Sequence, residues 1–206
     1  MKRLLSAALT LVLFAMLSPE CPAQMARRFT FGLEWGGELM LVSFHDYNYI
    51  GEDGSNISEN TLDWKRHELN AFVEAKVGIN LIDKLNISIL SGIKGMEKRN
   101  MLVPLEARLS FFPAGICKDG FLLSGGVGIC FGKPQFKIRS NTAIITAGYR
   151  HALEGGLALD LFAGLRVSSD HPEIYDEAAD RIVPQKDIRK NDAIYGEIIF
   201  GIGISF

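Results

Sequence analysis

The chain has 206 residues, of which 48% are hydrophobic and 22% are charged, and its formal net charge is -2. This composition excludes a disordered chain and a basic nucleic-acid-binding domain, and three cysteines are too few for a dense disulfide framework. The mean hydropathy is only slightly positive, which is too low for a bundle of membrane-spanning helices. The length allows one domain of ordinary size or two small ones.

The N-terminal segment has the layout of a cleavable secretory signal peptide. Two basic residues precede a short apolar run, and small residues surround Ala23. The apolar run is too short for a comfortable membrane-spanning helix. We therefore predict that residues 1–23 are removed after export and that residues 24–206 form the mature domain. Two alternatives are lipid attachment at Cys21, which the bulky and charged Glu20 disfavours, and retention of the segment as an anchor helix.

Beyond this segment, apolar and polar residues alternate with a period of two in eight stretches of the chain. In the first stretch the apolar set includes Leu33 and Trp35, and Glu34 and Glu38 occupy positions of the opposite parity. A period of two places the two sets on opposite faces of a strand, whereas a helix would mix them. We predict eight strands, over residues 29–43, 67–79, 85–96, 102–112, 120–132, 142–152, 156–167 and 192–206.

The connections between these strands differ in length. Residues 82–84 and 154–155 are tight turns and 113–120 is compact, whereas 44–63 and 168–190 are long, polar and charged. No later segment is apolar for long enough to form a membrane helix, so this chain can cross a membrane only as a closed barrel. The even strand number and the connections predict an all-β fold, an eight-stranded antiparallel up-and-down transmembrane β-barrel.

If the apolar faces contact lipid, the opposite faces fill the lumen, which in an eight-stranded barrel is just wide enough for side chains. The predicted lumen set holds six acids and five bases. A buried charge without a partner costs several kcal/mol to desolvate, which favours a structural salt-bridge network over a proton or solute pathway. The set consists of Glu34, Glu38, Glu74, Lys76, Lys94, Glu106, Arg108, Arg150, Asp160, Arg166 and Glu197.

The last predicted strand ends in an aromatic residue. Ile198, Phe200, Ile202 and Ile204 alternate before the terminal Phe206. With these features the mature chain resembles the small eight-stranded outer-membrane β-barrel proteins of Gram-negative bacteria, the porin-like outer-membrane β-barrel domain family. The resemblance implies an outer-membrane location, contact with outer-membrane lipid, and a final strand that the barrel-assembly machinery reads as its signal. It also implies that short turns face the periplasm and long loops face outside.

The residue types that commonly carry catalysis or bind metals show no recognisable pattern in this sequence. His45, His67, His151 and His171 are scattered, and no pair has the spacing of metal ligands. His67 is the one candidate base on the lipid face, and no serine stands beside it in the sequence. We therefore expect no catalytic, cofactor-binding or metal site, and no nucleic-acid partner.

These observations lead us to expect a non-enzymatic integral outer-membrane protein with a packed lumen. Its role would be structural, or surface interaction through the outer loops 44–63 and 168–190, with an extracellular ligand or envelope partner that the sequence does not name. One alternative is a narrow-pore, porin-like transporter of small solutes. A second alternative is an outer-membrane lipid-active enzyme, which would need a Ser–His–acid group or paired acids near the outer rim.

Overall fold

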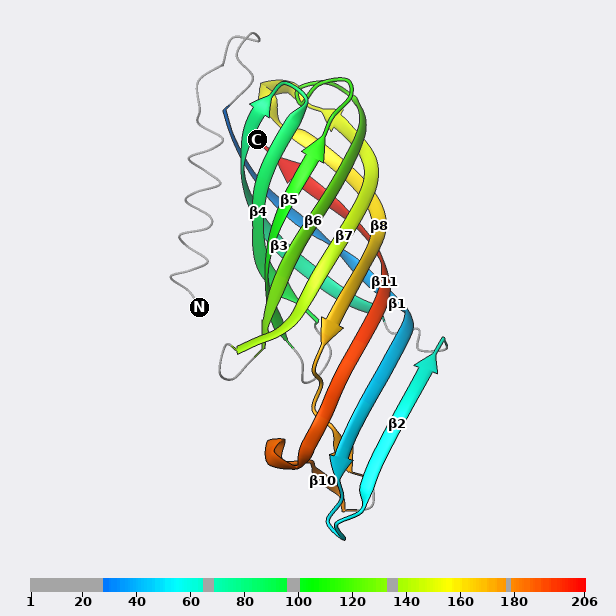
Figure 1. Ribbon diagram of the computed structural model, residues 1–206. Coiled ribbons are helices and arrows are strands. Elements are labelled where there is room, and N and C mark those ends of the chain that lie inside the picture. Colours follow the sequence, from blue (N-terminus) through cyan, green and yellow to red (C-terminus); the bar gives the residue numbers. More distant parts are fainter. Residues whose placement is uncertain (1–27, 65–68, 96–100, 133–136, 177–178) are drawn as a thin grey trace.

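The computed structural model describes residues 28–64, 69–95, 101–132, 137–176 and 179–206, so the predicted signal peptide lies outside the described residues. Eight antiparallel strands close into a barrel (Figure 1). Each barrel strand pairs with the next barrel strand along the chain, and the last pairs back with the first. This confirms the predicted fold. The barrel strands are β1 (Phe29–Ile50), β3 (Leu69–Ile82), β4 (Leu85–Lys94), β5 (Leu102–Phe111), β6 (Gly120–Gly132), β7 (Lys137–Ala152), β8 (Ala158–Asp170) and β11 (Ile188–Ser205).

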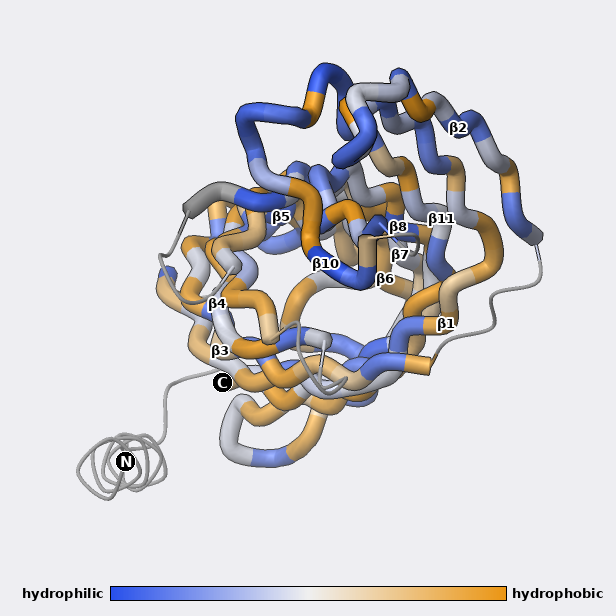
Figure 2. Tube along the Cα trace, turned by 90° about the horizontal axis from the view of Figure 1, so that it is seen from below, coloured by the Kyte–Doolittle hydropathy of each residue, from blue (hydrophilic) through white to orange (hydrophobic). Residues whose placement is uncertain are grey.

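The barrel turns apolar side chains outward and polar side chains inward. On β8, Leu161 and Leu165 are half exposed, whereas the neighbouring Asp160 and Arg166 are buried. A soluble domain would bury the leucines and expose the charges, so the strand faces match a barrel whose exterior contacts lipid. Figure 2, viewed from below, shows hydrophobic and hydrophilic residues alternating along the strands.

Residues 44–63 form a hairpin of strands, so the prediction of a long outer loop there is wrong. β1 continues to Ile50, and β2 (Asn56–Asp63) folds back along it in eight consecutive pairs. In the turn between them, the Ser55 N–H donates a hydrogen bond to Asp53 Oδ1 (2.9 Å). Gly54 has a φ of +79°, a conformation that glycine adopts at no steric cost.

A β-bulge in β1 marks the point where the alternating pattern of the sequence ends. The register of β1 against β11 shifts between Met40 and Val42. The extra residue reverses the parity of the strand, so that odd-numbered side chains beyond it continue the lumen face. Ser43 on this face is fully buried, and His45 and Tyr47 follow it along the same face.

Three strands extend past the barrel rim as an outer sheet, made of residues 43–50, 56–63 and 188–195 (Figure 1). The predicted outer loop 168–190 is also partly folded, because β8 runs to Asp170 and β11 begins at Ile188. Between them lie the paired strands β9 (Tyr175–Asp176) and β10 (Arg181–Ile182) and a one-turn 3₁₀ helix, η2 (Gln185–Asp187).

The outer sheet and the segment between β8 and β11 share a small apolar core. Tyr49, Ile174 and Val183 are buried together, and Ile57 and Ile188 pack against them. The two stretches that the sequence predicts as separate loops therefore form one packed layer outside the barrel.

The opposite end of the barrel, the short-turn end, carries the connections at residues 83–84, 112–119 and 153–157. The last of these includes a one-turn 3₁₀ helix, η1 (Glu154–Gly156). Within the described residues, no helix is long and apolar enough to cross a membrane.

Candidate functional site

The lumen holds the eleven charged residues that the sequence predicts for it, and none is more than 7% exposed. Seven of the eight barrel strands contribute to the set. β1 supplies Glu34 and Glu38, β3 supplies Glu74 and Lys76, β4 supplies Lys94, β5 supplies Glu106 and Arg108, β7 supplies Arg150, β8 supplies Asp160 and Arg166, and β11 supplies Glu197.

Arg108 is the first branch point of a central ion-pair network. Its Nη1 donates to Glu34 Oε2 (2.5 Å), and its Nε donates to Glu106 Oε1 (2.7 Å). Glu34 also accepts a hydrogen bond from Lys76 Nζ (3.2 Å). The Arg108 guanidinium thus joins β5 to β1, and Glu34 extends the connection to β3. Such charge-assisted bonds are among the stronger hydrogen bonds in proteins.

Arg166 is the second branch point and continues the network toward the outer rim. Its Nη2 donates to Glu106 Oε2 (3.2 Å), and its Nη1 pairs with Glu38. Lys94 Nζ lies 3.5 Å from Glu38 Oε2 and 4.0 Å from Glu197 Oε2. The central network is therefore continuous through six strands, and it brings together opposite charges that would be costly to bury singly.

Glu74 is the surplus acid of this network. Among the described residues, the central network has five carboxylates and four cations. The Glu74 side chain is fully buried, and neither of its carboxylate oxygens accepts a hydrogen bond from the described residues. Its nearest cations are Arg108, at 3.9 Å, and Arg166, at 4.0 Å. The sequence predicts the near balance of charge but not which acid lacks a close partner.

Arg150 forms a second charged layer nearer the short-turn end. Its Nε and Nη2 donate to the two oxygens of Asp160, at 2.7 and 2.6 Å, and Nη2 also donates to Ser205 Oγ (3.0 Å). The guanidinium lies 4.2 Å from the centre of the Phe112 ring. Its Nη1 donates to the Ile116 carbonyl (3.0 Å), which ties the 112–119 turn to the lumen.

The 112–119 turn packs apolar side chains into the short-turn end. Phe112, Ile116 and Leu122 form a buried cluster. The Ile116 N–H donates to the Asp83 carbonyl of the β3–β4 turn (2.7 Å). These contacts link the turn to a neighbouring connection across the mouth of the barrel.

Asp119 fastens the other side of the same turn. Its Oδ1 accepts a hydrogen bond from the Ala152 N–H (2.6 Å), and its Oδ2 lies 3.0 Å from His151 Nδ1. The bonds from Ala152 and His151 hold the pKa of Asp119 below its ordinary value. The turn is thus attached to both neighbouring connections.

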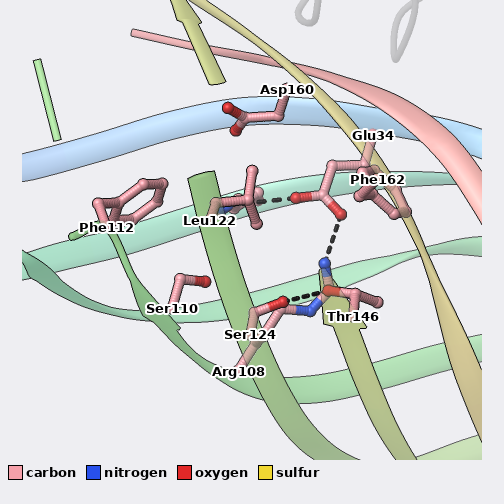
Figure 3. Close-up of a pocket in the computed structure, with 10 residues that line it drawn as sticks. Glu34, Arg108, Ser110, Phe112, Leu122, Ser124, Thr146, Asp160 and Phe162 are labelled. Carbon is pink, nitrogen blue, oxygen red and sulfur yellow. Dashed lines mark hydrogen bonds and ion pairs between the residues drawn. The ribbon is translucent and has the colours of Figure 1, made fainter. Parts of the chain in front are cut away.

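A small cavity is lined by Glu34 and Arg108 of the central network and by Asp160 of the second layer (Figure 3). Its volume of about 10 Å³ leaves room for about one water molecule. The Ser124 and Thr146 hydroxyls hydrogen-bond at its wall (2.5 Å). A cavity of this size does not hold a nutrient-sized solute. The lining residues are Glu34, Lys76, Arg108, Ser110, Phe112, Leu122, Ser124, Thr146, Asp160 and Phe162.

Lumen-facing glycines allow the strands to approach closely around these side chains. A Cβ atom at Gly92, Gly148 or Gly164 would lie 1.9–2.1 Å from a carbonyl oxygen of the adjacent strand. No side chain fits at such a distance, so these positions require glycine for its missing Cβ.

The candidate chemistry-bearing residues do not gather into one site. His151 pairs with Asp119 at the short-turn end, whereas His45 contacts the Tyr195 ring in the outer sheet (5.5 Å). His171 lies 3.5 Å from Asp192 in the outer layer. His67 is outside the described residues. Among those described, no three His, Cys, Asp or Glu side chains are grouped to hold a metal ion.

The terminal aromatic residue lies at the barrel seam, where β11 pairs with β1 and closes the barrel. Phe206 exchanges two backbone hydrogen bonds with Phe31, each 2.9 Å, and the two rings stack with centres 6.1 Å apart. On the preceding strand, Phe200 and Ile204 are exposed on the outer face. Ile198 and Ile202 share this face by parity.

The residues that sequence reasoning missed lie in the outer sheet. Tyr47 donates a hydrogen bond to Glu59, which also accepts one from Thr61 (2.7 Å), while Tyr49 anchors the outer apolar core. The Asp53–Gly54 pair is a recognised hairpin-turn signal and could have indicated this sheet.

A closed barrel with an apolar exterior and buried, paired charges defines an integral membrane β-barrel with a filled lumen. No protein-family model matches the sequence, and no curated protein matches it. Among solved structures, the crystal structure of the outer membrane protein OprG from Pseudomonas aeruginosa is similar, with 12% sequence identity and a TM-score of 0.38. The similarity covers 90% of this chain and 99% of that chain. The fold assignment follows from the strand pairing.

Proposed function

We propose that this chain is a non-enzymatic integral protein of the outer membrane, in which a packed lumen stabilises the barrel and the outer layer makes contacts beyond the membrane. The observation that carries the proposal is the continuous ion-pair network from Lys76 to Glu197, which occupies the barrel interior. A structural plug needs most of its buried charges to be paired in this way, because an uncompensated buried charge is strongly destabilising.

The location is supported by three features of the chain. They are the predicted signal peptide, the apolar exterior and the aromatic terminal strand. In this proposal the barrel-assembly machinery inserts the chain, outer-membrane lipid surrounds it, and the outer sheet faces outside. The outer layer would then be the part available to a ligand or an envelope partner.

Planar-bilayer conductance tests the plug. We expect little conductance from the refolded wild-type protein. The triple replacement Arg108→Ala, Arg150→Ala and Arg166→Ala removes both branch points of the central network and the arginine of the second layer, and it should open a leak. Replacing Arg181 and Arg189 by alanine is the matched control, because both side chains lie outside the barrel lumen.

A difference in gel migration between unheated and heated samples must first show that each variant is folded. Large and steady single-channel conductance from the wild-type protein would reject the plug and support the narrow-pore transporter. Turnover of phospholipid or lipid A by the wild-type protein would instead support the lipid-active enzyme.

A further inference from the structure

The free edge of β2 is the feature of the outer sheet that the proposed function leaves unused. β2 pairs with β1 along one edge, and within the described ranges no strand pairs with its other edge. Six of its eight side chains are exposed. Figure 1 shows β2 at the margin of the outer sheet, beyond the barrel rim.

The backbone register identifies the groups on this edge. At the turn, the Gly51 N–H donates to the Ser55 carbonyl (2.8 Å). Hydrogen-bonded pairs alternate in an antiparallel ladder, so the next such pair is Tyr49↔Ile57. The same alternation makes Tyr47↔Glu59 and His45↔Thr61 the following hydrogen-bonded pairs. The N–H and C=O groups of Ser58, Asn60 and Leu62, which alternate with these residues of β2, therefore point away from β1.

β2 lacks most of the devices that usually protect an edge strand. Natural edges are blocked by charged side chains, above all lysine, and by proline, bulges or short length, and of these β2 has only two acidic side chains. The β2 sequence NISENTLD contains neither lysine nor proline, and its eight pairs with β1 have no register shift. The strand is also held in place, since Ile57 packs on the outer apolar core.

The charge on β2 selects the kind of strand that can be added. Its charged residues are Glu59 and Asp63, four positions apart on one face of the sheet. Hydrogen bonds from Tyr47 and Thr61 hold the pKa of Glu59 below its ordinary value. Pairing of two copies of β2 would bring like charges together, and like charges across strands are destabilising.

We propose that the free edge of β2 binds an extended polypeptide segment with basic side chains four residues apart, by adding it as a fourth strand to the outer sheet. Main-chain hydrogen bonds to Ser58, Asn60 and Leu62 supply the affinity, and the acids supply the selectivity. This inference uses the outer sheet of the proposed function and not the packed lumen. Conductance through the barrel lumen would therefore contradict the proposed plug but not this inference.

The probe is a fluorescein-labelled octapeptide, TVKTVTKT, added to the full mature chain in nanodiscs. We expect saturable binding by fluorescence anisotropy and slower hydrogen exchange at the amides of Ser58, Asn60 and Leu62. The peptide with glutamate for lysine, and the peptide N-methylated on the amides that face β2, should not bind.

Asn60→Pro removes one outward N–H and should weaken binding about tenfold, as expected for one lost hydrogen bond and a steric clash. Asn60→Ala is the control, because it keeps the N–H, and it should bind like the wild type. Equal binding by both variants, or by the N-methylated peptide, would overturn the proposal. Protection of these amides without peptide, together with a dimeric mass, would assign the edge to a second copy and also overturn it.

Discussion

Arg108 and Arg166 each join acids that come from different strands of the barrel. Glu106 lies between them and accepts hydrogen bonds from both. Removing one member of such a network leaves its partners buried without compensation, which costs more than the pair itself contributes. At the scale of single residues, the lumen therefore depends on keeping both partners of each ion pair and on the close strand approach that the glycines allow.

Gly164→Ala should lower the free energy of unfolding by about 1–3 kcal/mol, the usual cost of overpacking. Its Cβ would lie 2.0 Å from the Ile145 carbonyl oxygen. Gly125→Ala is the matched control, because this exposed glycine has its nearest atom 3.8 Å away. Urea unfolding in lipid vesicles measures both changes. Equal losses would show that the close strand approach at Gly164 does not exist.

At the scale of elements, each barrel strand meets lipid on one face and packed polar side chains on the other. β8 shows both environments side by side, since Leu161 is 50% exposed on the outside and Ala158 is 6% exposed toward the lumen. A charge is therefore tolerated on one face and excluded from the other.

Leu161→Arg should destabilise the barrel by about 1–3 kcal/mol, because Leu161 is the fourth residue of β8 and the cost of a cation on the lipid face falls from its value at the bilayer midplane toward the interfaces. Ala158→Ser on the same strand should be far milder, because the lumen face accommodates a hydroxyl group. Vesicle-based unfolding curves compare the two. If the serine variant lost as much stability as the arginine variant, the two faces would be misassigned.

The last strand gives a prediction about biogenesis. Deleting Phe206, or replacing it with Asp, should slow insertion and leave chains in the periplasm for degradation. Phe206→Tyr keeps an aromatic terminus and is the control. The measurement is the amount of heat-modifiable barrel in the outer-membrane fraction. Normal amounts of the deletion variant would argue against a terminal assembly signal.

Refolding in vitro separates assembly from stability. Phe206 makes two backbone hydrogen bonds to Phe31, so the deletion also removes seam contacts. A variant that refolds in lipid vesicles but fails to accumulate in cells has lost the signal, and one that fails in both has lost the fold.

At the scale of the whole molecule, the two ends of the barrel are built differently. The 112–119 turn packs across the short-turn end, whereas the outer sheet projects past the opposite rim (Figure 1). The proposed orientation places the first end in the periplasm and the second outside the cell.

Cysteine labelling in intact cells tests this orientation. Cys117 lies in the short-turn end and is exposed, whereas Cys130 is buried. A membrane-impermeant maleimide should therefore leave the wild-type protein unlabelled until the outer membrane is permeabilised, when Cys117 reacts. Asp53→Cys, in the exposed β1–β2 turn, should react in intact cells. The reverse order of labelling would invert the orientation.

Much of the barrel follows from the sequence because lipid imposes a period of two on every strand that crosses it. Leu161 and Asp160 show how this constraint sorts adjacent residues to opposite faces. The same alternation predicts that the eleven buried charges lie on the lumen face. The same constraint is absent beyond the rim, where both faces of a strand contact water or other residues. The hairpin of β1 and β2 therefore has the composition of a loop.

The sequence by itself determined the eight membrane-crossing strands, their faces and the closed barrel, because these depend on local alternation and on the need to pair every backbone group in a membrane. The tertiary structure decided the rest. It set the bulge between Met40 and Val42, the pairing of Arg108 with Glu34 across the lumen, and the isolation of Glu74. Such contacts join residues far apart in the chain, and they depend on the register and curvature of strands that no local pattern specifies.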